Sequence, residues 1–104
     1  MLSAEEAKKM SEKNLKEQTN CLTKSLLGRA DNCIQIAVKE GKTHASFFVY
    51  DETGMSEAVN IVEDKIKSFG YKVEIINRWH NIDFINKLEY VFEIDWGENE
   101  QDNS

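Results

Sequence analysis

The chain has 104 residues, of which 40% are hydrophobic, 31% are charged and none is proline, a composition typical of one small domain with a modest core. Its formal net charge of −6 argues against binding to nucleic-acid phosphates, and no apolar run reaches the roughly 18 residues that cross a membrane. The first residues lead into a polar helical pattern without a signal peptide, so we expect a cytoplasmic protein with neither a nucleic-acid nor a membrane partner.

The chain divides into two parts with different composition. Residues 1–42 carry eight bases and six acids, whereas the remainder carries five bases and thirteen acids together with all ten aromatic residues. We predict a single domain over residues 1–96, made of a long helix at 1–41 and a β-α-β-β unit at 42–96. The polar segment at 97–104 is predicted to be a disordered acidic tail.

The first part has strong helix signals at both ends. Ser3 followed by Glu6 makes a capping box, and Gly41 follows the last apolar repeat as a C-terminal stop. A continuous helix over 4–40 would span about 55 Å at 1.5 Å per residue, which is too long for its own domain to cover. Gly28 is the one position where the helix could break into two antiparallel arms, and we favour the unbroken form.

The second part alternates strand and helix patterns. Aromatic and β-branched residues at 44–50 predict a strand, an amphipathic pattern at 56–69 predicts a helix, and 71–76 reads as a second strand. Strand, helix and strand in this order predict a parallel, right-handed crossover. Residues 88–96 alternate apolar and acidic side chains, which predicts a final strand with an acidic, solvated face.

The segment at 78–87 remains open between a long hairpin loop and strands that continue through a bulge. The predicted fold class is α+β: a long N-terminal helix and then β-α-β-β, with a three-stranded mixed sheet and the helices on one face. Three strands and one short helix make a thin core. A homo-oligomer that forms through the N-terminal helix would complete that core.

The turn Asp51–Glu52–Thr53–Gly54–Met55–Ser56 lies where α/β units bind anions at a helix N-terminus. It lacks a glycine-rich phosphate loop, and its two acidic residues would repel phosphate. Helix capping is therefore the expected role. Binding of Mg²⁺ with help from Asp83 or Asp95 is the alternative.

Candidate contact residues begin with the only two arginines, Arg29 and Arg78. Arginine is suited to bidentate recognition of carboxylate or phosphate, although Arg29 could simply form a salt bridge on the helix. Arg78 is followed by Trp79, His80 and Asn81, which makes this segment the best candidate for a contact patch. In the competing interpretation Trp79 packs beneath the sheet and His80 is merely solvated.

Catalytic chemistry has little support in the sequence. Cys21 and Cys33 lie on the long helix without a nearby histidine, and His44 and His80 match no metal or protease motif. We therefore expect no enzyme, no metal site and no cofactor.

Three segments lie in order along most of the chain: Leu2–Ser3–Ala4–Glu5–Glu6–Ala7 with Ser11–Glu12–Lys13–Asn14, Gly70–Tyr71–Lys72–Val73–Glu74, and Phe92–Glu93–Ile94–Asp95–Trp96. In them the chain resembles short accessory proteins encoded by tailed phages and prophages. The resemblance implies a protein that binds and disables a host protein or sequesters a host signalling nucleotide, in the host cytoplasm. It identifies no functional residue, because each of these segments is a cap, a turn or a strand.

Two functions follow as hypotheses. The first is a non-catalytic, homo-oligomeric protein that binds another protein through the Arg78–Trp79 region or through an acidic sheet face made by Glu89, Glu93 and Asp95. The alternative is a protein that binds a small anionic ligand, such as a nucleotide, at subunit junctions where Arg29 and Arg78 supply charge.

Overall fold

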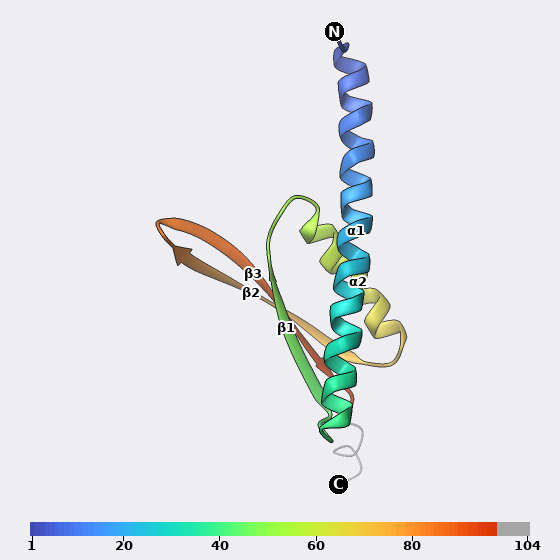
Figure 1. The fold of residues 1–104 in the computed structure, drawn as a ribbon, viewed down its shortest axis with the longest axis vertical. Coiled ribbons are helices and arrows are strands. Elements are labelled where there is room, and N and C mark those ends of the chain that lie inside the picture. Colours follow the sequence, from blue (N-terminus) through green and yellow to red (C-terminus); the bar gives the residue numbers. More distant parts are fainter. Residues whose placement is uncertain (98–104) are drawn as a thin grey trace.

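The computed structural model describes residues 1–97 and confirms the α+β class. All but the first residue of the predicted acidic tail lie outside the described residues. The chain forms two helices and one three-stranded sheet (Figure 1), whose elements are α1 (Ala4–Lys39), β1 (His44–Tyr50), α2 (Met55–Ser68), β2 (Lys72–Ile82) and β3 (Ile85–Asp95).

The long helix α1 is continuous through Gly28, as predicted. At its start the Ser3 hydroxyl accepts a hydrogen bond from the Glu6 amide at 3.1 Å, which is the predicted cap. At its end Gly41 takes a positive φ of 77°, and the Lys42 amide donates to the Ala37 carbonyl at 2.9 Å. The first 18 residues of the chain are all exposed, and the buried face of α1 begins at Thr19.

The sheet is antiparallel throughout, with the strand order β1-β3-β2. β1 and β2 run in the same direction, but β3 lies between them, so the predicted mixed sheet with adjacent parallel strands is wrong. The reason lies in the sequence of β3, whose run Tyr90–Val91–Phe92 places apolar side chains on both faces, and these are buried when the strand is central. The result is a split β-α-β arrangement.

β2 and β3 form one long hairpin in which the strands continue to the end. Their register is unbroken from Lys72 opposite Asp95 to Ile82 opposite Ile85, without a bulge. Only Asp83 and Phe84 make the turn. The open question at 78–87 is thus settled in favour of continued strands.

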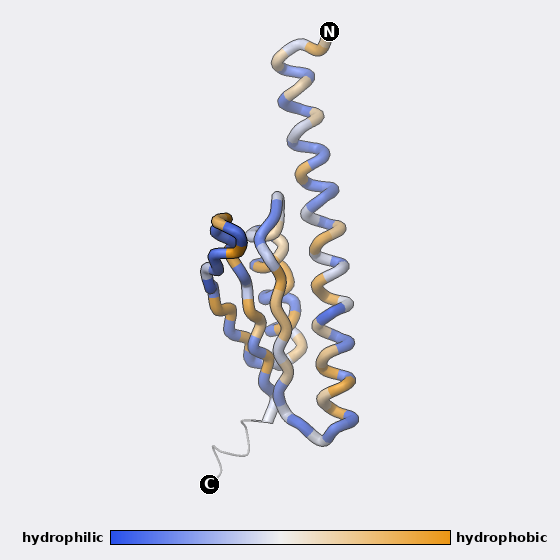
Figure 2. The backbone as a smooth tube through the Cα atoms, turned by 60° about the vertical axis from the view of Figure 1, so that its left-hand side comes forward, coloured by the Kyte–Doolittle hydropathy of each residue, from blue (hydrophilic) through white to orange (hydrophobic). Residues whose placement is uncertain are grey.

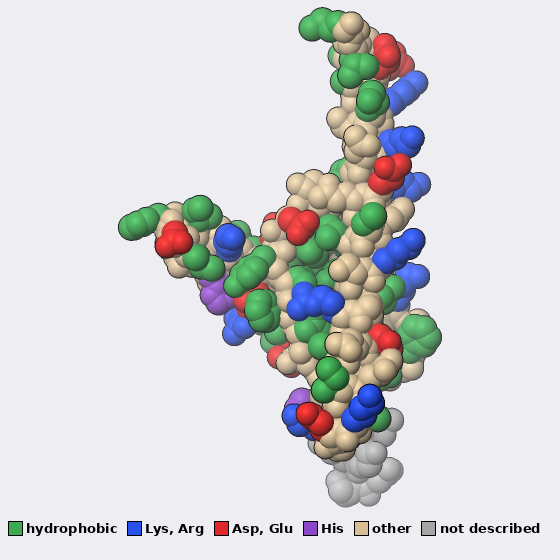
Figure 3. Space-filling view, in the orientation of Figure 1, with side chains coloured by type: hydrophobic (Ala, Val, Ile, Leu, Met, Phe, Trp, Pro, Cys, Tyr) green, Lys and Arg blue, Asp and Glu red, His purple; other side chains and the backbone are tan. Residues whose placement is uncertain are grey.

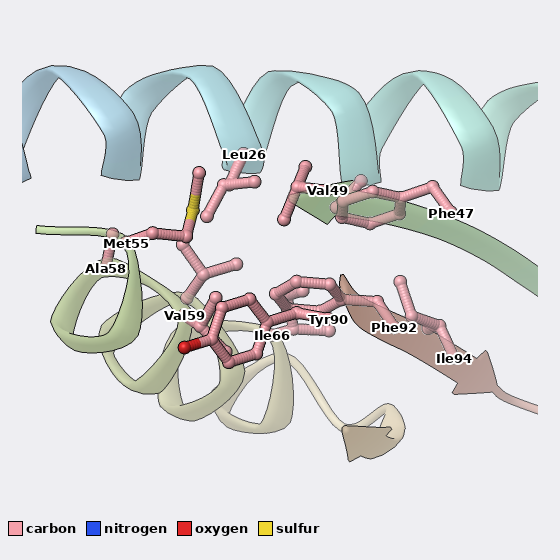
Figure 4. Close-up of a cluster of buried hydrophobic side chains, with 12 residues drawn as sticks. Leu26, Phe47, Val49, Met55, Ala58, Val59, Ile66, Tyr90, Phe92 and Ile94 are labelled. Atoms are coloured by element: carbon pink, nitrogen blue, oxygen red, sulfur yellow. The ribbon is translucent and has the colours of Figure 1, made fainter. Parts of the chain in front are cut away.

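Both helices pack on one face of the sheet, as predicted, and the core lies between the helices and that face (Figure 4). Phe47 of β1 and Phe92 of β3 stack at 4.6 Å between ring centroids, beneath Leu26 of α1. Twelve buried residues form this cluster: Leu26, Ala30, Phe47, Val49, Met55, Ala58, Val59, Val62, Ile66, Tyr90, Phe92 and Ile94.

The molecule is more extended than a domain of its length. Its radius of gyration is 17.4 Å and its extents are 66 × 34 × 23 Å, whereas a compact domain of 100 residues has a radius of gyration of about 13 Å. Two parts project from the body: the first half of α1, and the far half of the β2–β3 hairpin (Figures 1 and 2). We call residues 79–88 the hairpin arm.

Neither helix in the described part of the chain combines the length and apolarity needed to cross a membrane.

Candidate functional site

The hairpin arm is a two-stranded ribbon that extends beyond the rest of the sheet. β1 pairs with β3 only as far as Tyr50 opposite Glu89, so β2 and β3 continue without a third strand from that point. Every residue of the arm except His80 and Leu88 is exposed. In the space-filling view the arm stands apart from α1, with hydrophobic side chains at its end (Figure 3).

Large apolar side chains are exposed along the arm, from Trp79 at its base to Phe84 in its turn. Phe84 is 99% exposed, Trp79 is 69% exposed and Ile85 is 59% exposed, and Ile82 pairs directly with Ile85 across the two strands. A two-stranded ribbon has no core in which to bury them. The sequence reasoning singled out Trp79 and missed the others. The signal for them in the sequence was the run of apolar residues around Asp83, in a segment that has no glycine to mark a turn.

The turn at the end of the arm has an unfavourable backbone. Asp83 and Phe84 both take positive φ, 51° and 66°. Two-residue hairpin turns require this conformation and usually use Asn-Gly or Asp-Gly. A bulky residue there costs roughly 1–2 kcal/mol, so Phe84 occupies a position that glycine would satisfy better.

The predicted loop cluster Arg78–Asn81 lies on a regular strand instead. Successive side chains of β2 therefore point to opposite faces of the sheet, so the four neighbouring groups are divided between two faces. Arg78 and His80 lie on the face turned away from the helices. Trp79 lies on the other face, where it is exposed rather than packed beneath the sheet.

Arg78 and His80 converge on Glu89 of β3. The Arg78 guanidinium donates to one carboxylate oxygen of Glu89, from Nε at 3.0 Å and from Nη2 at 2.6 Å. His80 Nε2 lies 3.3 Å from the other oxygen, within ion-pair distance. These neighbours cover Glu89 so fully that it is buried, although it lies on the outer face. Its predicted role as a solvated acid is therefore wrong.

The two basic neighbours also set the acidity of Glu89. Desolvation by burial would raise the pKa of the Glu89 carboxyl, but the hydrogen bonds and positive charge of Arg78, together with the adjacent His80, outweigh it and hold that pKa below its usual value of 4.5. Glu89 is consequently ionised near neutral pH.

Tyr50 and Lys87 extend this cluster along the outer face. The Tyr50 ring meets the His80 ring edge to face at 6.4 Å between centroids, and Lys87 Nζ lies 5.6 Å from the centre of the Tyr50 ring. The base of the arm is thus held by five side chains from three strands: Tyr50, Arg78, His80, Lys87 and Glu89.

The other two predicted acids, Glu93 and Asp95, also lie on the outer face. Glu93 is exposed between Ser46 and Glu74, and Asp95 is half-buried between His44 and Lys72. The same face carries Phe48, Val91 and Ile76 in one cross-strand row. The expected uniformly acidic surface is therefore wrong, because apolar and basic side chains interrupt it.

Arg29 lies far from Arg78 in the fold. Its guanidinium carbon is 5.1 Å from the centre of the Phe47 ring, and Phe47 points toward the helices. Arg78 points away from them. The two arginines therefore do not form an anion site within one chain, and the site at subunit junctions stays a prediction.

The Asp51–Ser56 turn is a structural junction in the fold. Gly54 precedes α2 with a φ of 84°, and a Cβ at this position would lie 2.8 Å from the Thr19 hydroxyl of α1. Asp51 accepts a hydrogen bond from the Tyr90 hydroxyl at 3.2 Å. Burial, followed by the negative charge of Asp51, raises the pKa of Tyr90.

The predicted Mg²⁺ partners lie at opposite ends of β3. Asp83 lies at the end of the arm, whereas Asp95 ends β3 opposite His44. Within residues 1–97 no three His, Cys, Asp or Glu side chains form a group that could hold a metal ion. Cys21 is exposed and Cys33 is half-buried, and both are free thiols.

Neither a protein-family model, nor a curated protein, nor a solved structure matches this chain.

Proposed function

We propose that this chain is a non-catalytic interaction protein that binds another protein through its hairpin arm. The observation that carries the proposal is the exposure of Phe84, Trp79 and Ile85 on a two-stranded ribbon that continues beyond the end of β1. Aromatic side chains of this kind dominate the binding energy of protein interfaces. Burial in a partner would remove their apolar surface from water, and this gain would offset the backbone strain of the turn at Phe84.

The base of the arm supports the same proposal because it fixes the direction of the ribbon. Glu89 binds Arg78 and His80 on the strand beside it, and His80 contacts Tyr50 of β1. A fixed ribbon loses less conformational entropy on binding than a free loop would. The partner is expected to present an apolar pocket for Phe84.

The experiment uses two exposed phenylalanines as a matched pair. Phe84 is 99% exposed on the arm and Phe69 is 79% exposed at the end of α2. We expect Phe84→Asp to weaken partner retention in quantitative affinity capture by at least about 30-fold, as loss of a hot spot of about 2 kcal/mol requires. Phe69→Asp should retain the same partner. Equal retention by both variants would refute the proposal.

Self-association through α1 is a second candidate, supported by a different observation. All residues up to Gln18 are exposed, and the radius of gyration of 17.4 Å exceeds that of a compact chain. A second α1 would cover apolar side chains such as Met10 and Leu15 on this projecting half. Native mass spectrometry of the intact chain and of Leu15→Glu should then show an oligomer and a monomer, respectively.

A further inference from the structure

β1 presents an open edge to solvent. Within the described residues it pairs only with β3, and the amide of Asp51 donates to the Leu88 carbonyl at 2.8 Å while the amide of Trp96 donates to the Thr43 carbonyl at 3.0 Å. In an antiparallel ladder alternate residues bond to one side. The odd-numbered residues of β1 thus bond to β3, and the backbone N–H and C=O groups of Ser46 and Phe48 point to the open edge.

The two edges of the sheet differ in their side chains. β2 forms the other edge and carries charged residues at Lys72, Glu74 and Arg78. Charged residues on an edge strand hinder pairing with a further strand. β1 has the sequence HASFFVY, with no lysine, acidic residue, proline or glycine. β1 is therefore the edge that is open to strand addition.

Hollows flank this edge where α1 passes over it. One of about 370 Å³ lies between Leu22–Arg29 of α1 and Phe48–Tyr50 of β1. A second of about 270 Å³ lies between Cys33–Glu40 of α1 and His44–Ser46 of β1. Together they follow nearly the whole length of β1, which is the length of an extended peptide of about seven residues.

Arg29 lines the first hollow and has no carboxylate partner in the described part of the chain. Its guanidinium carbon lies 5.1 Å from the centre of the Phe47 ring. Of the other charges along the groove, Glu40 and Lys42 form an ion pair at 3.1 Å. Glu52 lines the same hollow as Arg29, just beyond the end of β1, and forms no ion pair with Arg29. Arg29 is thus the unpaired positive charge at the middle of the edge.

We propose that the open edge of β1 binds an extended segment of another protein as a fourth, antiparallel strand, with an acidic residue of that segment on Arg29. The segment would exchange backbone hydrogen bonds with Ser46 and Phe48. Alternate side chains of it would enter the hollows beneath α1, as in other cases of strand addition to a groove between a strand and a helix. This site is separate from the hairpin arm, so it does not depend on the function proposed above.

A second copy of this chain fits the edge less well. Paired strands lie about 4.8 Å apart. Because α1 packs over β1, pairing with the β1 of a second copy would bring the α1 helices of the two copies nearly as close to each other. Packed helices need 8–10 Å between their axes. A peptide strand without an attached helix has no such conflict.

The test selects ligands from a phage-displayed library of random twelve-residue peptides on the intact protein. We expect selected peptides to alternate apolar residues around one Asp or Glu. Amide hydrogen exchange with a selected peptide should slow at Ser46 and Phe48, whereas Phe47, which already bonds to β3, should change little. Arg29→Gln should weaken binding about 10-fold or more, in line with the loss of a charge-assisted hydrogen bond.

Two further variants separate edge pairing from side-chain effects. Ser46→Pro removes the amide that points to the open edge and should abolish binding, while Ser46→Ala should bind like the unchanged protein. Protection at other residues, or equal binding by Arg29→Gln and the unchanged protein, would overturn the proposal. Concentration-dependent protection of Ser46 and Phe48 without peptide would also overturn it, because a second copy would then occupy the edge.

Discussion

The two halves of the β2–β3 hairpin differ in how far their apolar side chains are buried. In the half next to the body, Val73 and Ile75 pack against the core and Phe92 is fully buried between the sheet and the helices. In the arm, Trp79, Phe84 and Ile85 have similar hydrophobicity and no cover. The same residue types therefore stabilise the fold in one half, and in the other they are free to bind a partner.

The largest difference is expected between two phenylalanines of this hairpin. Phe92→Ala should lower the free energy of unfolding by about 3–5 kcal/mol, because a fully buried ring leaves a cavity. Phe84→Ala should change it by less than about 0.5 kcal/mol, as an exposed substitution does. Urea unfolding of both variants measures the contrast. Similar losses would mean that the arm belongs to the core.

Two glycines provide the next contrast. Gly54→Ala places a Cβ 2.8 Å from the Thr19 hydroxyl at a φ of 84° and should cost about 1–2 kcal/mol of stability. Gly28→Ala meets no atom within 4 Å inside α1 and should add up to about 1 kcal/mol. Thermal unfolding of the two variants should therefore shift in opposite directions. A gain for Gly54→Ala would contradict the close approach of α1 to α2.

A smaller effect is expected at the turn of the arm. Phe84→Gly relieves a positive φ of 66° and should stabilise the arm by about 1 kcal/mol, seen as slower amide exchange at Ile82 and Ile85. The same change should weaken partner retention as strongly as Phe84→Asp. A variant that is more stable and still binds would refute the role of the ring.

The smallest effect concerns pH. Because the pKa of Glu89 is lower in the fold than its usual value of 4.5, its contacts stabilise the protein above that value, and the stability is lost as pH falls through the lowered pKa. Urea midpoints measured between pH 3 and pH 7 should fall less steeply on acidification in Glu89→Gln. If the urea midpoint of Glu89→Gln fell with pH as steeply as that of the unchanged protein, Glu89 would not contribute to the loss of stability in acid.

Local signals were sufficient for most elements of the fold. The capping box at Ser3, the stop at Gly41 and the apolar repeats predicted both helices and the first strand, because each depends on residues close in sequence. The sheet order was missed because pairing of β1 with β3 joins residues about 45 positions apart, a choice decided by burial of β3 on both faces. The hairpin turn was missed because Asp83–Phe84 lacks the usual glycine.

The candidate site was predictable only in part. Arg78, Trp79 and His80 stood out by residue type, and Trp79 is exposed as the interaction hypothesis requires. Their division between two faces, and the burial of Glu89 by Arg78 and His80, depend on the register of β2 and β3. Residue type alone carries no such information. Phe84 was missed for the same reason, since its exposure follows from the length of the hairpin beyond β1.

Site-specific photocrosslinking tests the role of the hairpin arm most directly. Benzoylphenylalanine replaces Phe84 in one variant and the similarly exposed Phe69 in the other, and both are irradiated in the producing cells. We predict a crosslinked species of one discrete mass from position 84 and none of that mass from position 69. The same adducts from both positions, or none from position 84, would contradict binding through the arm.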